Sequence, residues 1–324
     1  MTVITRSHLE AAMETVHAVF PGTPQYSWPL LNARLGCEVW VKHENHTPVG
    51  AFKLRGGLVF MADRARNKST RGMITATRGN HGQSIATASR RYGMDCTIVV
   101  PEGNSAEKNA AMEAQGGKLI VHGHDFQAAA EHAASLAESE GLDMLPSFHE
   151  LLARGVGTYA MELMLSRPDL ETIYVPIGLG SGICGVISAR DALGLKTEVV
   201  GVVADTAPAY ALSFEAGEPV STNTADTMAD GVACRVPVPA ALDIILKGAA
   251  RILRVTDPEI RAAMRWYYRD THNIAEGAGA VPLAGLWRER EKMSGRKAGV
   301  ILTGGNIDRG LYAQVLTESD DVDA

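Results

Sequence analysis

The chain has 324 residues, of which 46% are hydrophobic and 21% are charged, and its formal net charge is −6. This composition is typical of a compact globular chain with one large or two medium domains, and the negative charge without a lysine- and arginine-rich block argues against nucleic acid or a membrane surface as a partner. No apolar run is long enough to span a bilayer, and the N-terminus has no hydrophobic signal core.

The N-terminal region is predicted to contain a helix, a strand and a second helix. Apolar residues recur at helical spacing over Ser7–Phe20, whereas Val39 and Val41 alternate with polar neighbours as in a strand. The strand ends before Pro48, because proline cannot donate to a sheet. A helix is expected over Leu54–Arg66.

Lys53 stands at the start of this second helix, between Phe52 and Leu54. A lysine among apolar side chains is partly desolvated, which lowers its pKa and frees the amine for Schiff-base chemistry. The alternative is a surface lysine whose stem lies along the helix, the usual state of this residue type. The remainder of the chain favours the first interpretation.

Strand and helix patterns alternate through residues 67–148, which is typical of a parallel α/β sheet. We therefore expect a small domain over residues 67–148, inserted into a large domain formed by residues 1–66 and 149–324. The strands expected in the small domain are Met73–Ala76, Cys96–Val100 and Leu119–Val121, and its expected helices are Gln83–Tyr92, Ser105–Gln115 and Phe126–Ser139.

The second half of the chain continues the alternation. Thr256 and Glu259 have the spacing of a capping box and predict a helix start. The acidic tail Glu318–Ala324 is expected to fray. The other expected elements are helix Glu150–Leu165, strand Thr172–Pro176, a helix from about Ile183, strand Glu198–Val203, an irregular segment Pro219–Pro239, helix Ala280–Arg290 and strand Gly299–Leu302.

A glycine-rich stretch, Gly178-Leu179-Gly180-Ser181-Gly182, joins a predicted strand to a predicted helix. Glycines at a helix N-terminus expose backbone N–H groups, and such a place suits a phosphate. Gly180, Gly182 and Gly185, with Asp205 about 20 residues further on, also fit the dinucleotide-binding fingerprint. A tight turn without a ligand is the third interpretation.

Two more polar turns follow predicted strands. The backbone N–H groups of the sequence TRGNHGQ, residues 77–83, could bind a carboxylate, with Asn80 as a directional donor, although His81 could equally be an ordinary helix-start residue. In TGGN, residues 303–306, the Thr303 hydroxyl could hydrogen-bond a weakly basic ring nitrogen without protonating it. The alternative for TGGN is an ordinary turn that contains glycine.

The four cysteines are far apart and form no C-x-x-C pair. A disulfide framework and a cysteine zinc site are therefore not expected, and we expect a protein of the reduced cytoplasm. The cysteines are Cys37, Cys96, Cys184 and Cys234.

Taken together, GAFKLRGG around Lys53, RGNHGQ, the glycine-rich stretch and TGGN resemble, in order and spacing, the fold-type II pyridoxal-phosphate enzymes. The resemblance is greatest to the serine/threonine dehydratase and serine racemase family, and it covers about Pro21 to Asn306. It implies an α/β fold of two parallel-sheet αβα domains, with pyridoxal 5'-phosphate in the cleft between them.

The resemblance also implies a role for each motif. Lys53 would hold the cofactor as a Schiff base and move the Cα proton of the substrate. Around the cofactor it implies Phe52 beside it, Asn80 on its phenolic oxygen, Thr303 (where the family usually has serine or cysteine) on its ring nitrogen, Glu276 near the ring, and Gly178, Leu179, Gly180 and Ser181 around the phosphate. For the substrate carboxylate it implies the backbone of Thr77, Arg78, Gly79, Asn80 and His81.

The chain departs from the family at several positions that bear on substrate choice. Arg78 stands where racemases carry a serine that works on the face opposite the lysine. A guanidinium is a poor proton shuttle but a good partner for a second carboxylate. Ala204 and Tyr210 match carboxylates that bind a divalent cation in racemase-like members, so no metal site is expected. Ser147, Phe148, His149 and Arg154 replace residues that are usually small or rich in Asn and Asp.

We therefore predict a pyridoxal-phosphate enzyme that eliminates the β-hydroxyl of an amino acid such as L-threonine or L-serine, giving a 2-oxo acid and ammonia. Arg78 leaves 3-hydroxyaspartate, or another hydroxy amino acid with a polar end, as an alternative substrate. Three further functions compete with this prediction. They are an amino-acid racemase, a nicotinamide oxidoreductase, which would leave Lys53 unused, and a silent amino-acid-binding module, which could dispense with it.

The expected partners are the small-molecule amino-acid substrate and further copies of the chain. We expect a homodimer or a higher homo-oligomer in the cytoplasm that binds neither nucleic acid nor membrane. No regulatory domain is recognised after the TGGN motif, so feedback control by isoleucine is not expected.

Overall fold

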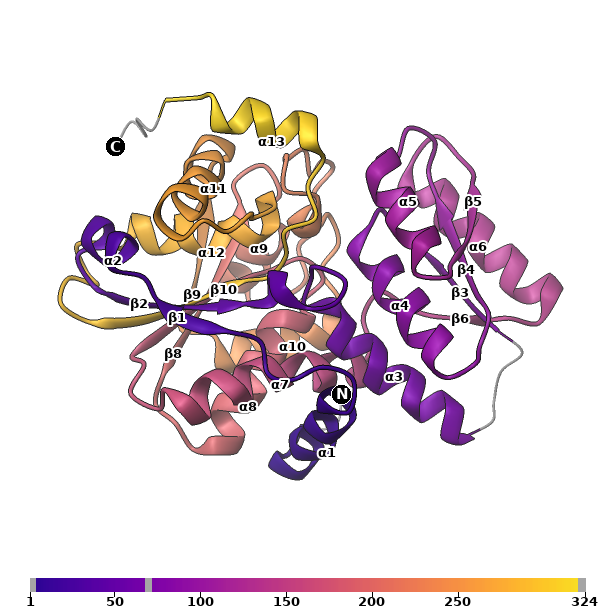
Figure 1. Ribbon diagram of the computed structural model, residues 1–324, viewed down its shortest axis with the longest axis horizontal. Helices are drawn as coiled ribbons and strands as arrows, with labels where there is room; N and C mark the ends of the chain where they lie inside the picture. Colours follow the sequence, from indigo (N-terminus) through magenta and orange to yellow (C-terminus); the bar gives the residue numbers. More distant parts are fainter. Residues whose placement is uncertain (1–3, 68–71, 320–324) are drawn as a thin grey trace.

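The computed structural model describes residues 4–67 and 72–319, which form helices around two separate sheets (Figure 1). The helices are α1 (Arg6–His17), α2 (Pro29–Leu35), α3 (Lys53–Asn67), α4 (Asn80–Arg91), α5 (Ala106–Ala114), α6 (Phe126–Glu140), α7 (Glu150–Ser166), α8 (Ser181–Leu193), α9 (Ala209–Ala216), α10 (Pro239–Gly248), α11 (Asp257–Thr271), α12 (Gly277–Arg288) and α13 (Arg309–Leu316), with short 3₁₀ turns η1 (Glu44–His46) and η2 (Asp230–Val232). The strands are β1 (Gln25–Ser27), β2 (Glu38–His43), β3 (Met73–Ala76), β4 (Cys96–Val100), β5 (Lys118–Val121), β6 (Asp143–Met144), β7 (Thr172–Pro176), β8 (Glu198–Ala204), β9 (Arg251–Val255) and β10 (Lys297–Leu302).

The larger sheet has six strands in the order β1-β2-β10-β7-β8-β9. All neighbours are parallel except β1 and β2. The central strand β10 pairs on both sides, so that Val300 lies opposite Val41 on β2 and Tyr174 on β7. Because β2, β7, β8 and β10 run in one direction, the segments that follow them all lie at the same edge of the sheet.

The smaller sheet has four parallel strands in the order β5-β4-β3-β6. Its residues and the helices α4, α5 and α6 form a lobe beside the larger sheet (Figure 1). The two parallel-sheet lobes confirm the predicted fold class. The exact domain boundaries at residues 66/67 and 148/149 stay a prediction, and the connection at residues 68–71 lies outside the described residues.

Each sheet is buried on both faces, because alternate residues of a strand belong to different cores. On β8, Val200 and Val202 pack with α11 and α12, whereas Val199 and Val203 pack with α7, α8 and α10. In the smaller sheet, one face packs against α4 and the other against α6. Strands buried on both faces read as continuous apolar runs, which explains why several were recognisable in the sequence.

Helix α3 connects the two lobes, because it packs against both α7 and α4. Glycines make this close approach possible. A Cβ atom at Gly56 would lie 2.8 Å from the backbone oxygen of Leu152 on α7, and one at Gly57 would lie 2.4 Å from the Ser84 hydroxyl on α4. The first residue of α3, Lys53, is therefore held at the junction of the lobes.

Most predicted elements are present, but several boundaries were wrong. The first helix ends at His17 rather than Phe20. Helices α4 and α8 begin at Asn80 and Ser181, three and two residues earlier than predicted. At α8 the left-handed φ of 100° at Gly180 allows the chain to turn into the helix there. Glu318 pairs with Arg261 in the tail that was expected to fray, and the rest of the tail, residues 320–324, lies outside the described residues.

No helix within residues 4–67 and 72–319 combines the length and the apolar character that crossing a membrane requires. All four cysteines are buried and free.

Candidate active site

Lys53 lies at the edge of the larger sheet where its parallel strands end. Gly50 adopts a left-handed φ of 69° just before it, and the Phe52 N–H donates to the Thr303 carbonyl over 2.9 Å. Ala51 also forms a β-bridge with Gly304. These contacts attach the start of α3 to the segment after β10, so that Lys53 and Thr303 line the same cavity.

The Lys53 amine lies beside an aromatic ring. Its Nζ atom lies 4.5 Å from the centre of the Phe52 ring. Burial lowers the pKa of Lys53 to about 8, although the nearby Glu276 carboxylate acts in the opposite direction. A lysine with a pKa near neutrality is partly unprotonated under physiological conditions, and it can act as a nucleophile or a base.

The glycine-rich loop, residues 178–182, lies on the other side of this cavity, between β7 and α8. Gly180 has a φ of 100°, which favours glycine. At Gly178, a Cβ atom would lie 2.2 Å from the Gly231 oxygen. The path of the loop therefore requires glycine at both positions.

The loop presents unpaired backbone donors. Within the described chain, none of the backbone N–H groups from Gly178 to Ile183 donates to a protein acceptor. They lie at the N-terminal end of α8, where the helix dipole adds positive potential. Successive free N–H groups of this kind form a binding site for a phosphate.

Asn80 and Glu276 connect the lobes beside the cavity. The Asn80 Nδ2 donates to Glu276 Oε1 over 2.6 Å, and the Asn80 Oδ1 accepts from Asn306 Nδ2 over 2.8 Å. The amide orientation of Asn80 is therefore fixed, with its second N–H left for a ligand. Burial raises the pKa of Glu276, and the charge of Lys108 partly offsets this effect.

The turn at residues 77–81 offers fewer backbone donors than the sequence suggested. The Thr77 N–H donates to Val99, and the Gly79 N–H donates to the Thr77 hydroxyl over 3.2 Å. The N–H groups of Asn80 and His81, in the first turn of α4, have no acceptor among the described residues. The Arg78 N–H likewise has no acceptor in the described part of the chain, so these three groups can receive a carboxylate.

His81 is uncharged and its ring lies close to Lys53. Burial, and then the charge of Lys53, lower the pKa of His81 to about 3. Its buried Nε2 atom has no hydrogen-bond partner among residues 4–67 and 72–319. His81 thus stands in the first turn of α4, as the helix-start alternative has it, but its Nε2 atom makes no bond to a backbone group.

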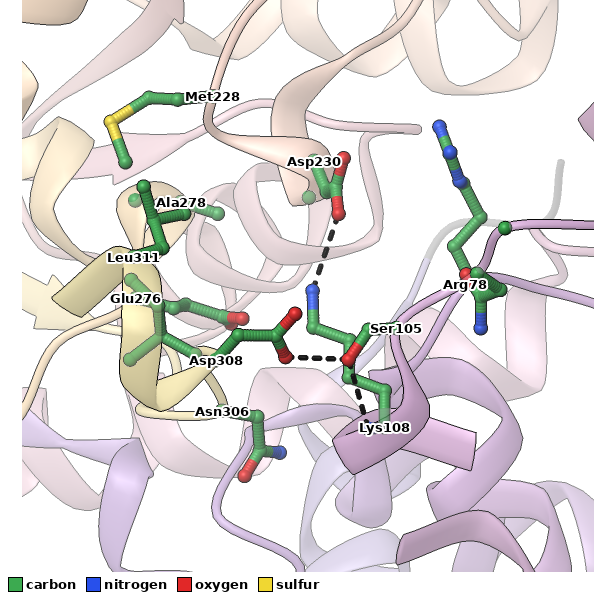
Figure 2. A pocket seen from close by; sticks show the side chains of 15 residues that line it. Arg78, Ser105, Lys108, Met228, Asp230, Glu276, Ala278, Asn306, Asp308 and Leu311 are labelled. Carbon is green, nitrogen blue, oxygen red and sulfur yellow. Dashed lines mark hydrogen bonds and ion pairs between the residues drawn. The ribbon is translucent and has the colours of Figure 1, made fainter. Parts of the chain in front are cut away.

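A larger cavity of about 230 Å³ adjoins the first one, with which it shares Gly231, Glu276 and Ala278. Figure 2 shows its polar lining, with Arg78 on one side and Asp308 and Glu276 on the other. Arg78 is exposed, and no acidic side chain of the described residues forms an ion pair with it.

Two contacts across this cavity join the lobes. Lys108 on α5 pairs with Asp230 over 3.2 Å, and Ser105 bonds Asp308 over 2.5 Å (Figure 2). Lys108 also lies against the turn, because a Cβ atom at Gly79 would be 2.9 Å from the Lys108 Cδ atom. These residues were missed in the sequence, where nothing indicates that α5 faces the larger sheet.

A buried ion network lies behind Lys53 and was also missed. Arg55 is fully buried and bonds Glu44 and Glu162, with Nε and Nη1 distances of 2.6 Å. Lys42 bonds Glu162 over 2.6 Å, so two cations face two carboxylates. The network attaches the first turn of α3 to β2, η1 and α7, elements whose contacts the sequence did not reveal.

Comparison with known proteins agrees with this geometry. The family model of pyridoxal-phosphate dependent enzymes matches residues 18–304. The chain belongs to this family. The enzyme is 29% identical to the L-threonine ammonia-lyase of Thermotoga maritima over 317 residues, which are 98% of this chain and 79% of that protein.

Two other similarities bear on the site. The pyridoxal-phosphate enzyme is 31% identical to the L-threo-3-hydroxyaspartate ammonia-lyase of Saccharomyces cerevisiae over 300 residues, 92% of each chain. The structure of maize serine racemase matches it with a TM-score of 0.91 and 25% identity, and the match covers 97% of both chains. The predicted family and cofactor are thus confirmed, and a nicotinamide cofactor is not supported.

The glycines of the dinucleotide fingerprint serve this enzyme in another way. Gly185 lies inside α8, and a Cβ atom there would be 2.8 Å from the Gly157 nitrogen on α7. The third glycine of the fingerprint is therefore explained by helix packing. Asp205 is exposed after β8 and lines neither cavity.

The residues present fit pyridoxal phosphate but not a divalent cation. The free loop amides suit its phosphate, and the hydroxyl of Thr303, which lines the cavity, has no hydrogen-bond partner among the described residues. At the position of the racemase-type metal site, by contrast, the Ala204 side chain has no ligand atom. The Tyr210 hydroxyl there is hydrogen-bonded to two backbone groups. The described residues hold no group of three or more His, Cys, Asp or Glu that could bind a metal.

Proposed function

We propose that this protein is an ammonia-lyase that eliminates the β-hydroxyl group of a hydroxy amino acid and releases a 2-oxo acid and ammonia. The observation that carries the proposal is the convergence of Lys53, the glycine-rich loop and Thr303 on one cavity at the carboxyl edge of the larger sheet. The names of the Thermotoga and yeast relatives, both ammonia-lyases, support the same reaction.

Pyridoxal phosphate, when bound, supplies an electron sink for the negative charge that develops at the substrate Cα atom. Lys53 acts as the base that removes the Cα proton. A pKa of about 8 suits this role, because a general base is most effective near the working pH. The Glu276 carboxylate tends to hold a proton on Lys53, and burial of the lysine opposes it.

The other site residues orient the reacting groups. The Thr303 hydroxyl would bond the ring nitrogen of the cofactor, and the free N–H of Asn80 would bond its phenolic oxygen. Phe52 would pack beside the ring, and the amides of residues 178–183 would hold the phosphate. The backbone N–H groups of Arg78, Asn80 and His81 bind the substrate carboxylate, since the Thr77 and Gly79 amides are already paired.

L-Threonine and L-serine are the first substrates to consider, and one observation favours a second class. Arg78 is a cation without an acidic partner among the described residues, and it lines the cavity of about 230 Å³ next to the Lys53 site. A carboxylate at the far end of the substrate could bond its guanidinium. This supports 3-hydroxyaspartate as an alternative substrate, whereas racemisation is slow because a guanidinium is a poor proton shuttle.

The experiment is a substrate panel with the purified protein loaded with pyridoxal phosphate. L-Serine, L-threonine and L-threo-3-hydroxyaspartate are each incubated with it, and ammonia and 2-oxo acid are measured together. We expect equal amounts of the two products from at least one substrate, and little change in the chirality of the remaining amino acid. Failure of all β-hydroxy amino acids to release ammonia would contradict the proposal.

We also propose that the enzyme works as a homo-oligomer in the cytoplasm. Four buried, unpaired cysteines suit a reducing compartment. Three large apolar side chains are at least 47% exposed, those of Tyr26, Leu30 and Tyr268. Contact with a second copy of the chain would remove them from water, which supports an oligomer. Light scattering on the purified protein should give a mass at least twice that of one chain, and a monomer would contradict this part of the proposal.

A further inference from the structure

Tyr210, the first of two tyrosines that hold the glycine-rich loop, lies on α9 and is only 1% exposed. Its Oη atom donates to the Leu179 carbonyl over 3.0 Å and accepts from the Val238 N–H over 3.0 Å. The hydroxyl thus connects the loop to the segment before α10. No role was predicted for this tyrosine beyond its being unsuited to a metal.

The bond to Leu179 fixes the direction of a loop amide. The carbonyl of Leu179 and the N–H of Gly180 belong to one planar trans peptide unit, in which the two groups point in opposite directions. Tyr210 therefore turns the Gly180 N–H away from itself. Gly180 lines the cavity, and its N–H is one of the donors without a protein acceptor in the described chain.

A second buried tyrosine acts in the same way further along the loop. The Oη atom of Tyr159 on α7 donates to the Gly182 carbonyl over 3.2 Å, which sets the direction of the Ile183 N–H. Burial raises the pKa of both tyrosines, so both remain neutral donors. Two phenols on different helices thus fix two peptide units of one loop.

We propose that Tyr210 is a positioning residue that keeps the glycine-rich loop in its phosphate-binding conformation without a divalent cation. This inference rests on the proposed use of the loop for the cofactor phosphate. In this chain the two hydrogen bonds of Tyr210 hold the loop. Tyr210 and Ala204 stand where racemase-like relatives carry the carboxylates that bind a cation.

The test compares the affinities of the Tyr210→Phe variant for pyridoxal phosphate and for pyridoxal, which lacks the phosphate. Both are titrated into the cofactor-free protein and followed by visible absorption. We expect the affinity for pyridoxal phosphate to fall about fivefold to tenfold, the effect of losing one or two hydrogen bonds, while the affinity for pyridoxal stays within twofold. Added EDTA should not change the wild-type affinity.

Tyr174→Phe is the matched control. Tyr174 is also buried, and its hydroxyl bonds Glu289 over 2.7 Å, away from the loop. A purely structural loss would lower the melting temperature of both variants without changing the ratio of the two affinities. If Tyr210→Phe fails to fold, Tyr159→Phe tests the same idea through Gly182, with a shift in the same direction.

The possible outcomes separate this inference from the proposed function. An unchanged affinity ratio in Tyr210→Phe, or in Tyr159→Phe if that variant is the one used, would overturn the positioning role. A loss of wild-type affinity in EDTA that magnesium restores would also overturn it. If the wild-type protein binds no pyridoxal phosphate at all, the proposed function fails first.

Discussion

Replacement of Arg78 by serine tests which substrate the larger cavity admits. Arg78 is exposed at the wall of that cavity, so water screens its charge. A hydrogen bond to a charged group contributes about 1.5–3 kcal/mol, and exposure places this one near the lower end. About 1.5 kcal/mol corresponds to roughly a tenfold change in specificity. The Arg78→Ser variant should therefore lose about tenfold in kcat/KM for 3-hydroxyaspartate relative to threonine.

The assay measures kcat/KM for both substrates in the wild type, in Arg78→Ser and in a control variant, Arg66→Ser. The Arg66 side chain is 74% exposed at the end of α3 and lines neither cavity. The preference for 3-hydroxyaspartate should decrease as salt is added, because salt screens an exposed pair. An equal ratio of kcat/KM values in the wild type and Arg78→Ser would refute the role of Arg78 and favour threonine and serine as substrates.

Three further changes test other parts of the structure. Thr303→Ala should weaken pyridoxal phosphate binding by about 1 kcal/mol. Thr303→Asp should protonate the ring nitrogen and so change the visible spectrum of the cofactor and the ratio of reaction products. Unchanged spectra in both variants would exclude the contact between Thr303 and the ring. Gly178→Ala should lower cofactor affinity measured by absorption, because its Cβ atom would lie 2.2 Å from the Gly231 oxygen. Burial alone would raise the pKa of Glu162, but Arg55 and Lys42 lower it to about 2, so Glu162→Gln should destabilise the protein by about 3–5 kcal/mol at pH 7. The contribution of Glu162 to the free energy of unfolding is fully present above pH 4.5 and disappears as the pH falls towards 2. Urea unfolding should therefore show a smaller difference between Glu162→Gln and the wild type at pH 3 than at pH 7. An equal difference at the two pH values would contradict the assignment.

Much of the site could be predicted from the sequence because each motif is local. The glycine-rich loop and Thr303 closely follow strands with a clear apolar pattern, and Lys53 follows β2 after the short turn η1. Once those strands are taken as parallel, their ends meet at one edge of a sheet. The two-residue shift in the start of α8 did not affect this inference, because the loop glycines themselves determine its path.

Other parts could not be predicted because they depend on contacts between distant residues. Tyr210 reaches the loop from α9, a helix of eight residues without a clear amphipathic pattern in the sequence. Arg55 pairs with Glu44 and Glu162, which lie 11 and 107 residues away in the sequence. In the sequence alone, each of these charged residues is typical of a surface position. Strand β9 is only partly buried along most of its length, so its sequence shows no alternation.

Substitution of Lys53 by alanine tests whether this lysine holds the cofactor and serves as the base of the elimination. The wild-type protein loaded with pyridoxal phosphate should be yellow and should release ammonia from a β-hydroxy amino acid. Lys53→Ala should lose both properties, whereas Lys118→Ala, which alters an exposed lysine on β5, should keep them. Ammonia release by the Lys53→Ala variant at a rate close to that of the wild type would contradict the account.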